Sequence, residues 1–344
     1  MAQLLEAQPF DLRTQGFINQ LKKHSTRNTY SAGLQEFQKL LFLKNLTIYQ
    51  WVELVDKDRL KSPLEASNIA TDTLKDFVDS MEKKHLSPNT INLYVSSVQS
   101  LIKFLYRGRY QITTKFAGLP EPDPLSSKEE WSLPLISEFF LSMRKPLYRA
   151  LVAVIFQSGL GIEEALNLTY GDIQAEYEQD LRPICLELKR RKTKVPFHTF
   201  IGSVAVNQLA KYFEAVGTPA PEQPIFHRAP NSRLPSNEMK TLSKGGIERY
   251  FWRRARRCIK KKWIGENPRR PHSLRAAFQR LLILAHCPEI FTEYFMGHEV
   301  ARNKQAYIIK GMGKEEFRKQ YQIFESALTF KTDDATSKGE KEDE

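Results

Sequence analysis

Apolar positions in the first third of the chain follow a helical spacing. From residue 12 to residue 110 they recur three and four residues apart, as in helices that bury one face. Ser87 followed by Pro88 is typical of a helix start, because Ser caps free backbone N–H groups and Pro fits the first turn. The spacing predicts an N-terminal bundle of four helices, at roughly 13–24, 26–41, 70–84 and 88–105.

A break in this pattern predicts a linker between two domains. Residues 117–132, AGLPEPDPLSSKEEWS, include three prolines within five residues and then two serines. Proline favours extended backbone and interrupts helices, so such a stretch separates folded parts of a chain. We therefore expect one domain over residues 1–116 and a second domain over residues 133–330.

The second domain combines helical patterns with one short alternating stretch. Residues 184–200 alternate around a basic turn, which predicts a β-hairpin. The expected fold class is mainly α with a small β component. The end of the chain, residues 331–344, is polar and rich in acids, so we expect a disordered acidic tail. The other apolar patterns predict helices near 137–143, 146–157, 203–213, 245–262 and 314–328.

The composition argues against membrane spans and metal sites. The 344 residues are 41% hydrophobic, and no window of about 20 uncharged apolar residues occurs. The N-terminal residues carry acids and lack the apolar core of a signal peptide, so we expect a cytoplasmic protein without a membrane partner. Cys185, Cys258 and Cys287 are scattered without metal-ligand spacing, which favours free thiols and no metal.

Basic residues are concentrated in one predicted helix. The net charge is +12, and eight basic residues lie between residues 249 and 262, interleaved with Tyr250, Phe251 and Trp252. Such a helix is typical of contact with nucleic-acid phosphates, and a merely solvated basic surface is the alternative. The basic residues are Arg249, Arg253, Arg254, Arg256, Arg257, Lys260, Lys261 and Lys262.

The segment directly after this helix carries the strongest candidate chemistry. His272 and Arg275 share one helix face because they are three residues apart, and Pro288 and Gly297 then mark a break and a turn. An arginine and two histidines can bind a phosphate diester, and a tyrosine hydroxyl can attack it. The three elements in register are His272-x-x-Arg275, Gly297-His298 and Tyr307.

This spacing resembles the signature of the tyrosine recombinase (phage-integrase-like) family, which is H-x-x-R, then G-H, then a nucleophilic tyrosine. Tyr294 and Tyr321 lie at other distances from Gly297-His298 and do not match. The resemblance implies an α+β catalytic domain over 133–330 and an N-terminal core-binding, SAM-like helical bundle that clamps double-stranded DNA. It also implies that Tyr307 forms a 3′-phosphotyrosyl intermediate without a metal, ATP or another cofactor.

The resemblance assigns roles to residues outside this segment. The family carries a lysine on a hairpin that gives a proton to the departing 5′ oxygen, and Lys192 is the best match, ahead of Lys194 and Lys189. Arg27 lies in a helix start similar to those of the core-binding domain, so we expect it to contact DNA. Helix capping alone also explains this helix start.

One position departs from the family pattern. The segment from Ser158 to Ile173 resembles T-G-L-R-x-x-E-L-x-x-L-x-x-x-D-I, but Gly161 stands where the family has its first catalytic arginine. Glu164 matches the buried acid of this pattern. The charge could be replaced, the enzyme could be slow, or the chain could bind DNA without cleaving it. The candidate replacements are Arg149, Lys189, Arg190, Arg191 and Arg302.

The expected function is that of a site-specific DNA recombinase or integrase of a mobile element. The family acts as a homo-oligomer on DNA, so we expect a tetramer that pairs two DNA sites in the cytoplasm, associated with the nucleoid. Two alternatives stay open: a DNA-binding or architectural relative with weak catalysis, and a type IB topoisomerase-like enzyme. The topoisomerase would relax any supercoiled plasmid without pairing two sites.

Overall fold

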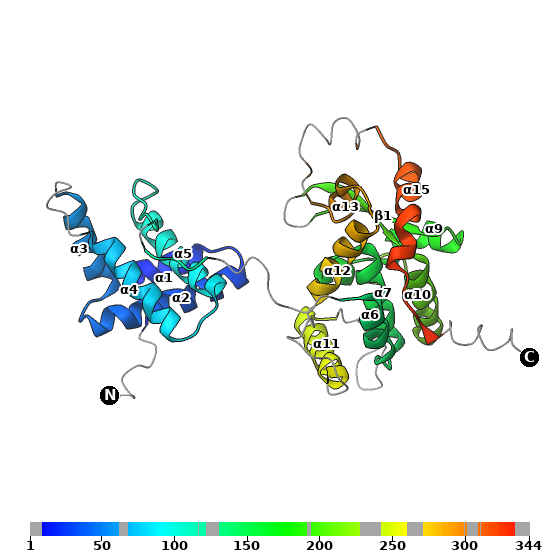
Figure 1. Ribbon diagram of the computed structural model, residues 1–344, viewed down its shortest axis with the longest axis horizontal. Coiled ribbons are helices and arrows are strands. Elements are labelled where there is room, and N and C mark those ends of the chain that lie inside the picture. Colours follow the sequence, from blue (N-terminus) through cyan, green and yellow to red (C-terminus); the bar gives the residue numbers. More distant parts are fainter. Residues whose placement is uncertain are drawn as a thin grey trace, which may run out of the picture. The chain divides into compact units, whose positions relative to one another are not determined.

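The chain divides into two compact units, Met1–Ser126 and Ser127–Glu344. The computed structural model, drawn in Figure 1, describes most of both units. Of residues 257–259 it describes the backbone only. The described ranges are 9–61, 68–115, 117–121, 131–190, 194–227, 242–259, 271–298, 300, 309 and 311–333. Most of the predicted linker and nearly all of the predicted tail lie outside these ranges.

The first unit is a helical bundle. Its core joins side chains from successive helices, and the rings of Phe37, Trp51 and Phe77 meet edge to face with centroids 4.9 and 5.2 Å apart. The indole N–H of Trp51 donates to Thr73 Oγ1 at 3.1 Å, which satisfies its one polar group. Within the described ranges the helices are α1 (Leu12–Gln20), α2 (His24–Leu43), α3 (Ile48–Arg59), α4 (Ile69–Lys83) and α5 (Pro88–Leu105).

The structure contains one helix, α3, that was not among the four predicted for this unit. Its start has a capping box: Thr47 Oγ1 accepts from Gln50 N, and Gln50 Oε1 accepts from Thr47 N. Its buried side chains include Ile48, Trp51 and Val55. The Thr-x-x-Gln pattern was therefore the signal in the sequence that could have predicted α3.

The second unit is built around α7 (Pro146–Ser158), whose residues 150–158 are all buried. Helices α10 (Ser203–Val216) and α12 (Pro271–Leu284) pack against it. The hydroxyl of Tyr321 donates to the backbone oxygen of Gln157 at 2.7 Å, which joins the C-terminal helix α15 (Lys314–Phe324) to the same core. The other helices of this unit in the described ranges are α6 (Leu133–Leu141), α8 (Ile162–Leu166), η2 (Tyr170–Asp172), α9 (Gln174–Glu178), α11 (Lys244–Ile259), α13 (Glu289–Phe295) and η4 (Glu325–Leu328).

One hairpin completes this unit. Strand β1 (Ile184–Lys189) pairs antiparallel with β2 (Pro196–Ile201), and the last pair in the register is Lys189 with Pro196. Arg190 follows β1 directly, and its N–H donates to Val195 O at 2.8 Å. The predicted fold class, mainly α with a small β component, is therefore confirmed. No helix in the described ranges is long and apolar enough to cross a bilayer.

Several predicted boundaries shift by a few residues. Helix α6 starts at Leu133 rather than near 137, because the Ser132 hydroxyl caps it and Pro134 fits its first turn. The basic helix α11 runs from Lys244 to Ile259, and residues 260–262 of the predicted helix lie outside the described ranges.

Candidate active site

Arg275 is the most buried of the predicted site residues that the structure describes. Helix α12 places Leu274 and Phe278 in the core, and Arg275 beside them is only 1% exposed. Its Nη1 donates to the backbone oxygen of Gly159, and its Nη2 donates to the backbone oxygen of Met296. Burial lowers the pKa of Arg275 to about 10, so the guanidinium keeps its charge at neutral pH.

Two glycines make these carbonyl contacts possible. Gly159 ends α7 with φ +64°, and a Cβ there would lie 2.5 Å from the ring of Phe278. Gly297 follows α13 with φ +62°, and a Cβ there would lie 2.8 Å from the ring of Phe197. Since other residues rarely adopt such φ values and would collide with these rings, both turns require glycine.

His298 lies just after the Gly297 turn and contacts Arg275. The Nη2 of Arg275 is 3.1 Å from His298 Nε2, and His298 Nδ1 is 2.5 Å from Glu293 Oε2. A guanidinium only donates, so Nε2 accepts and the ring proton is on Nδ1, where it is donated to Glu293. Glu293 also accepts from Gln279 Nε2 at 2.7 Å. Our sequence reasoning missed Glu293, which fixes the tautomer and orientation of His298.

His272 lies in the first turn of α12 and is partly exposed to solvent. Partial burial lowers its pKa, and the positive charges of Arg275, Arg190 and Lys244 lower it further. These charges favour the neutral form of His272. The structure thus brings His272, Arg275 and His298 together.

Glu164 links the Gly161 position to the hairpin. The N–H of Gly161, at the start of α8, donates to Glu164 Oε2 at 2.9 Å. The Nη1 of Arg190 lies 2.9 Å from Glu164 Oε1 and 2.7 Å from Oε2. Arg190 is therefore the candidate cation that lies beside the position of the missing arginine.

The other candidate cations are elsewhere or outside the described ranges. Arg149 pairs with Asp333 and donates to Met143 O at 2.7 Å. Lys189 and Lys194 are exposed, and Lys194 has φ +62° in the hairpin turn. The remaining candidates, Arg191 and Arg302, and the predicted proton donor Lys192 lie outside the described ranges.

The predicted nucleophile Tyr307 also lies outside the described ranges, whereas its two rivals lie inside them. Tyr294 is 6% exposed, its hydroxyl is 2.7 Å from His198 Nδ1, and burial raises its pKa to about 12. Tyr321 is fully buried, its hydroxyl donates to Gln157 O, and burial raises its pKa well above the usual value. Neither rival hydroxyl can reach a DNA backbone without leaving the core.

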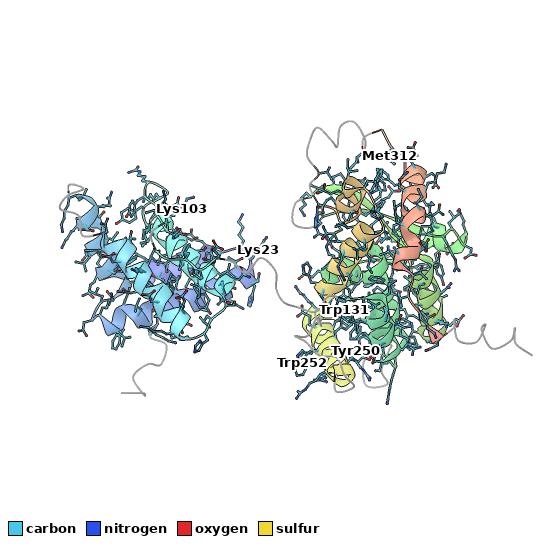
Figure 2. The ribbon with its side chains drawn as sticks, viewed as in Figure 1. Lys23, Lys103, Trp131, Tyr250, Trp252 and Met312 are labelled. Atoms are coloured by element: carbon cyan, nitrogen blue, oxygen red, sulfur yellow. The ribbon has the colours of Figure 1, made fainter. Side chains whose placement is uncertain are left out.

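Helix α11 has one buried stripe and one basic face. Ile247, Phe251 and Ala255 are buried four residues apart. Figure 2 labels Tyr250 and Trp252 on this helix; Tyr250 stacks on Tyr148 at 3.6 Å between centroids. The side chains of Arg249, Arg253 and Arg256 are exposed, Arg254 donates to Tyr250 Oη at 3.1 Å, and Arg256 lies over the Trp252 ring at 5.2 Å. The Arg257 side chain and Lys260 lie outside the described residues.

Arg27, predicted to contact DNA, is directed toward its own unit. It is half-buried, and its Nη2 donates to the backbone oxygens of Leu21 at 2.9 Å and Asn19 at 3.4 Å. These carbonyl groups belong to the end of α1, so Arg27 stabilises the connection between α1 and α2. DNA contact by Arg27 stays a prediction.

Comparison with solved structures assigns this architecture to a known class. The fold is that of the tyrosine recombinases. No protein-family model and no curated protein sequence matches the chain. A lambda integrase (75–356) dimer bound to a COC′ core site is 15% identical with a TM-score of 0.57, covering 86% of this chain and 92% of that one.

Two further solved structures have the same fold. The Tn1549 transposon integrase in complex with transposon right end DNA is 15% identical with a TM-score of 0.55, covering 89% of this chain and 97% of that one. The XerH site-specific recombinase bound to a palindromic difH substrate is 16% identical with a TM-score of 0.52, covering 87% and 80%.

Proposed function

We propose that this chain is a tyrosine recombinase that cleaves and rejoins double-stranded DNA, as the integrase of a mobile element. One observation carries the proposal. The guanidinium of Arg275 lies beside His298, and the charges of Arg275 and Arg190 act on His272, in a fold shared with integrases whose solved structures contain DNA. The sequence spacing that links these residues to Tyr307 adds the nucleophile.

The proposed reaction is a transesterification with balanced proton transfers. The Tyr307 hydroxyl attacks the phosphorus, forms a 3′-phosphotyrosyl bond and breaks the bond to the 5′ oxygen. Neutral His272 is suited to accept the tyrosine proton, and Lys192 is suited to protonate the leaving 5′ oxygen. A 5′ hydroxyl then attacks the phosphotyrosine, gives its proton to the now neutral Lys192 and restores the diester. The bond from phosphorus to the Tyr307 oxygen breaks, and this oxygen takes back the proton held by His272. Since the intermediate conserves the bond energy, the cycle requires no ATP, metal or other cofactor.

Arg275 provides preorganised charge for this reaction. Its guanidinium is fixed by two backbone oxygens and His298, so its orientation does not change as charge develops on the phosphate. Glu293 serves as a positioning residue, because it holds the proton of His298 on Nδ1 and leaves Nε2 beside Arg275.

Covalent trapping tests the proposal. The full chain is incubated with nicked suicide duplexes drawn from the junctions of the element that encodes it, then separated on a denaturing gel. We expect a DNA-shifted band for the native chain and no band for Tyr307→Phe, which retains the ring and loses the nucleophile. A band of equal intensity from Tyr307→Phe would exclude Tyr307.

Gly161 favours a second candidate function, a DNA-binding or architectural relative without cleavage. Losing one preorganised donor at a charged transition state costs on the order of 10²–10³-fold in rate. Specific retardation of the junction duplexes on a native gel, together with no covalent band, would select this function.

DNA binding is expected to depend on salt through α11. Each arginine that contacts a phosphate contributes roughly one unit to the slope of log affinity against log salt. We expect the triple substitution Arg249→Ala, Arg253→Ala and Arg256→Ala to lower the slope by about 3, measured by fluorescence anisotropy at several salt concentrations. Lys319→Ala, an exposed charge on α15, is the matched control. An unchanged slope in the triple variant would show that α11 does not contact DNA phosphates.

The proposal includes assembly on DNA. We propose that the chain forms a homotetramer that pairs two DNA sites and is associated with the nucleoid. Sedimentation of the chain with and without junction duplexes measures its oligomeric state. Relaxation of any supercoiled plasmid by a monomer would instead support a type IB topoisomerase-like enzyme.

A further inference from the structure

Two arginines from distant parts of the chain are fixed to one short turn. Arg275 on α12 donates to Gly159 O at the end of α7. Two residues later, the Gly161 N–H donates to Glu164, and Glu164 accepts from Arg190. The turn between α7 and α8 therefore binds Arg275, and Glu164 in the first turn of α8 binds Arg190 of the hairpin.

Gly161 leaves the space beside this turn open. Among the residues that the structure describes, a Cβ at Gly161 would meet only the Glu164 carboxylate within 4 Å, with its nearest atom at 3.1 Å. The backbone there has φ −71° and ψ 154°, which any residue can adopt. Neither space nor backbone therefore requires glycine, unlike at Gly159 and Gly297.

Arg190 has donors left for a ligand. Its Nη1 is shared between both oxygens of Glu164, and within the described part of the chain no acceptor lies on its Nε or Nη2. A purely structural pair would use the two-nitrogen fork of the guanidinium, which is the stronger geometry. The side chain is 21% exposed and that of Glu164 is 13% exposed, so the group is oriented yet accessible.

The electrostatics agree with this geometry. Beyond the effect of burial, the charge of Arg190 lowers the pKa of both Arg275 and His272. Like charges held close together destabilise the free protein, and a bound anion relieves their repulsion. Lys244, the other cation near His272, pairs instead with Glu163 at 3.0 Å.

We infer that Arg190 contacts the reacting phosphodiester with its unused donors and thereby replaces the arginine absent at Gly161. Glu164 is the positioning residue that orients it. The assignment of a reaction to this contact rests on the proposed function, whereas the anion contact itself does not.

Rates of covalent trapping test the role in the reaction. Arg190→Ala is expected to slow adduct formation on the order of 10²–10³-fold, with Arg190→Lys intermediate. Lys319→Ala, which removes an exposed charge from α15, is the control and should react at the native rate. The combination Gly161→Arg with Arg190→Ala should recover at least about tenfold, because it returns a guanidinium to the same space. Equal melting temperatures show that a rate loss is not a folding loss.

Binding of inorganic phosphate tests the anion contact independently. Phosphate is titrated into the full chain and followed by calorimetry, for the native chain and the same variants. We expect Arg190→Ala to weaken phosphate binding at least about tenfold, as for a lost charged hydrogen bond, and Gly161→Arg to restore it.

The two assays separate the possible failures. In one outcome, phosphate binding depends on Arg190 but the native chain forms no covalent band. This outcome would support the anion site and contradict recombination as the function. In a second outcome, the native chain forms the covalent band, and Arg190→Ala reacts and binds phosphate as the native chain does. This outcome would overturn the role of Arg190 but not the proposed function. If the native chain and Arg190→Ala bind phosphate equally and neither forms adduct, both proposals fail.

Discussion

Arg275→Ala is expected to lose covalent adduct formation by at least about 10³-fold and to destabilise the second unit. The activity falls because the variant removes the guanidinium that lies between His298 and the two backbone oxygens. The stability falls because the oxygens of Gly159 and Met296 lose their donor, at about 1–3 kcal/mol for each buried acceptor left unsatisfied. Trapping rates and urea unfolding of the full chain measure the two effects.

Arg275→Lys separates charge from geometry. Lysine restores the positive charge but lacks the planar fork that reaches two carbonyl groups and His298 together. We therefore expect Arg275→Lys to regain part of the stability and little of the activity. Lys319→Ala, which removes an exposed charge from the same unit, should change neither quantity. Native rates and stability in Arg275→Ala would show that the reacting phosphate binds elsewhere.

The sequence was sufficient for the parts of the site that follow from local geometry. His272 and Arg275 are three residues apart on one helix, so their shared face could be predicted from spacing alone. Gly297 could be predicted as a turn, because a helix end favours glycine there. The convergence of these segments came from the family resemblance, since spacing does not place one helix against another.

The replacement cation could not be chosen from the sequence. Lys189 ends strand β1 and Arg190 follows it directly, and neighbouring side chains of extended backbone point to opposite sides. Which face meets α8 depends on the register of the hairpin, whose last pair is Lys189 with Pro196. Only the structure shows that Arg190 reaches Glu164.

Glu293 was missed for a similar reason. It and Glu289 lie on the same short helix, and nothing in the local sequence distinguishes them. Glu289 is exposed, whereas Glu293 lies between His298 and Gln279. The difference arises from the rotation of α13 against α12, which is a property of packing.

A buried ionic cluster holds α15 to the second unit. Glu176 on α9 accepts from Arg318 Nη2 at 2.8 Å, from Lys314 Nζ at 2.5 Å and from the Cys185 N–H at 2.7 Å. Arg318 also donates to the backbone oxygen of Pro183. Glu176 and Arg318 are 8% and 6% exposed, so each is the buried counter-charge of the other. Arg318 also pairs with the exposed Glu315 at 3.0 Å.

Glu176→Gln is therefore expected to lower the free energy of opening of α15 by up to about 3–5 kcal/mol, because Arg318 keeps only the exposed Glu315 as a counter-charge. Hydrogen exchange of the full chain measures this value in the amides of α15 and β1, with the amides of α2 as the internal reference. Combining Glu176→Gln with Arg318→Met should cost less than the sum of the single changes, because the partners are coupled.

The same cluster predicts that the docking of α15 weakens as the pH falls. Burial alone would raise the pKa of Glu176, but hydrogen bonds from Arg318, Lys314 and the Cys185 N–H lower it below the usual value of 4.5. A carboxylate with a lowered pKa stabilises the fold fully above that usual value, and the stabilisation is lost as the pH falls through the folded-state pKa. Protection of α15 in the native chain should thus decline below about pH 4.5, while Glu176→Gln, already weaker at pH 7, should decline less. Equal acid dependence in the two proteins would show that other carboxylates control the docking of α15.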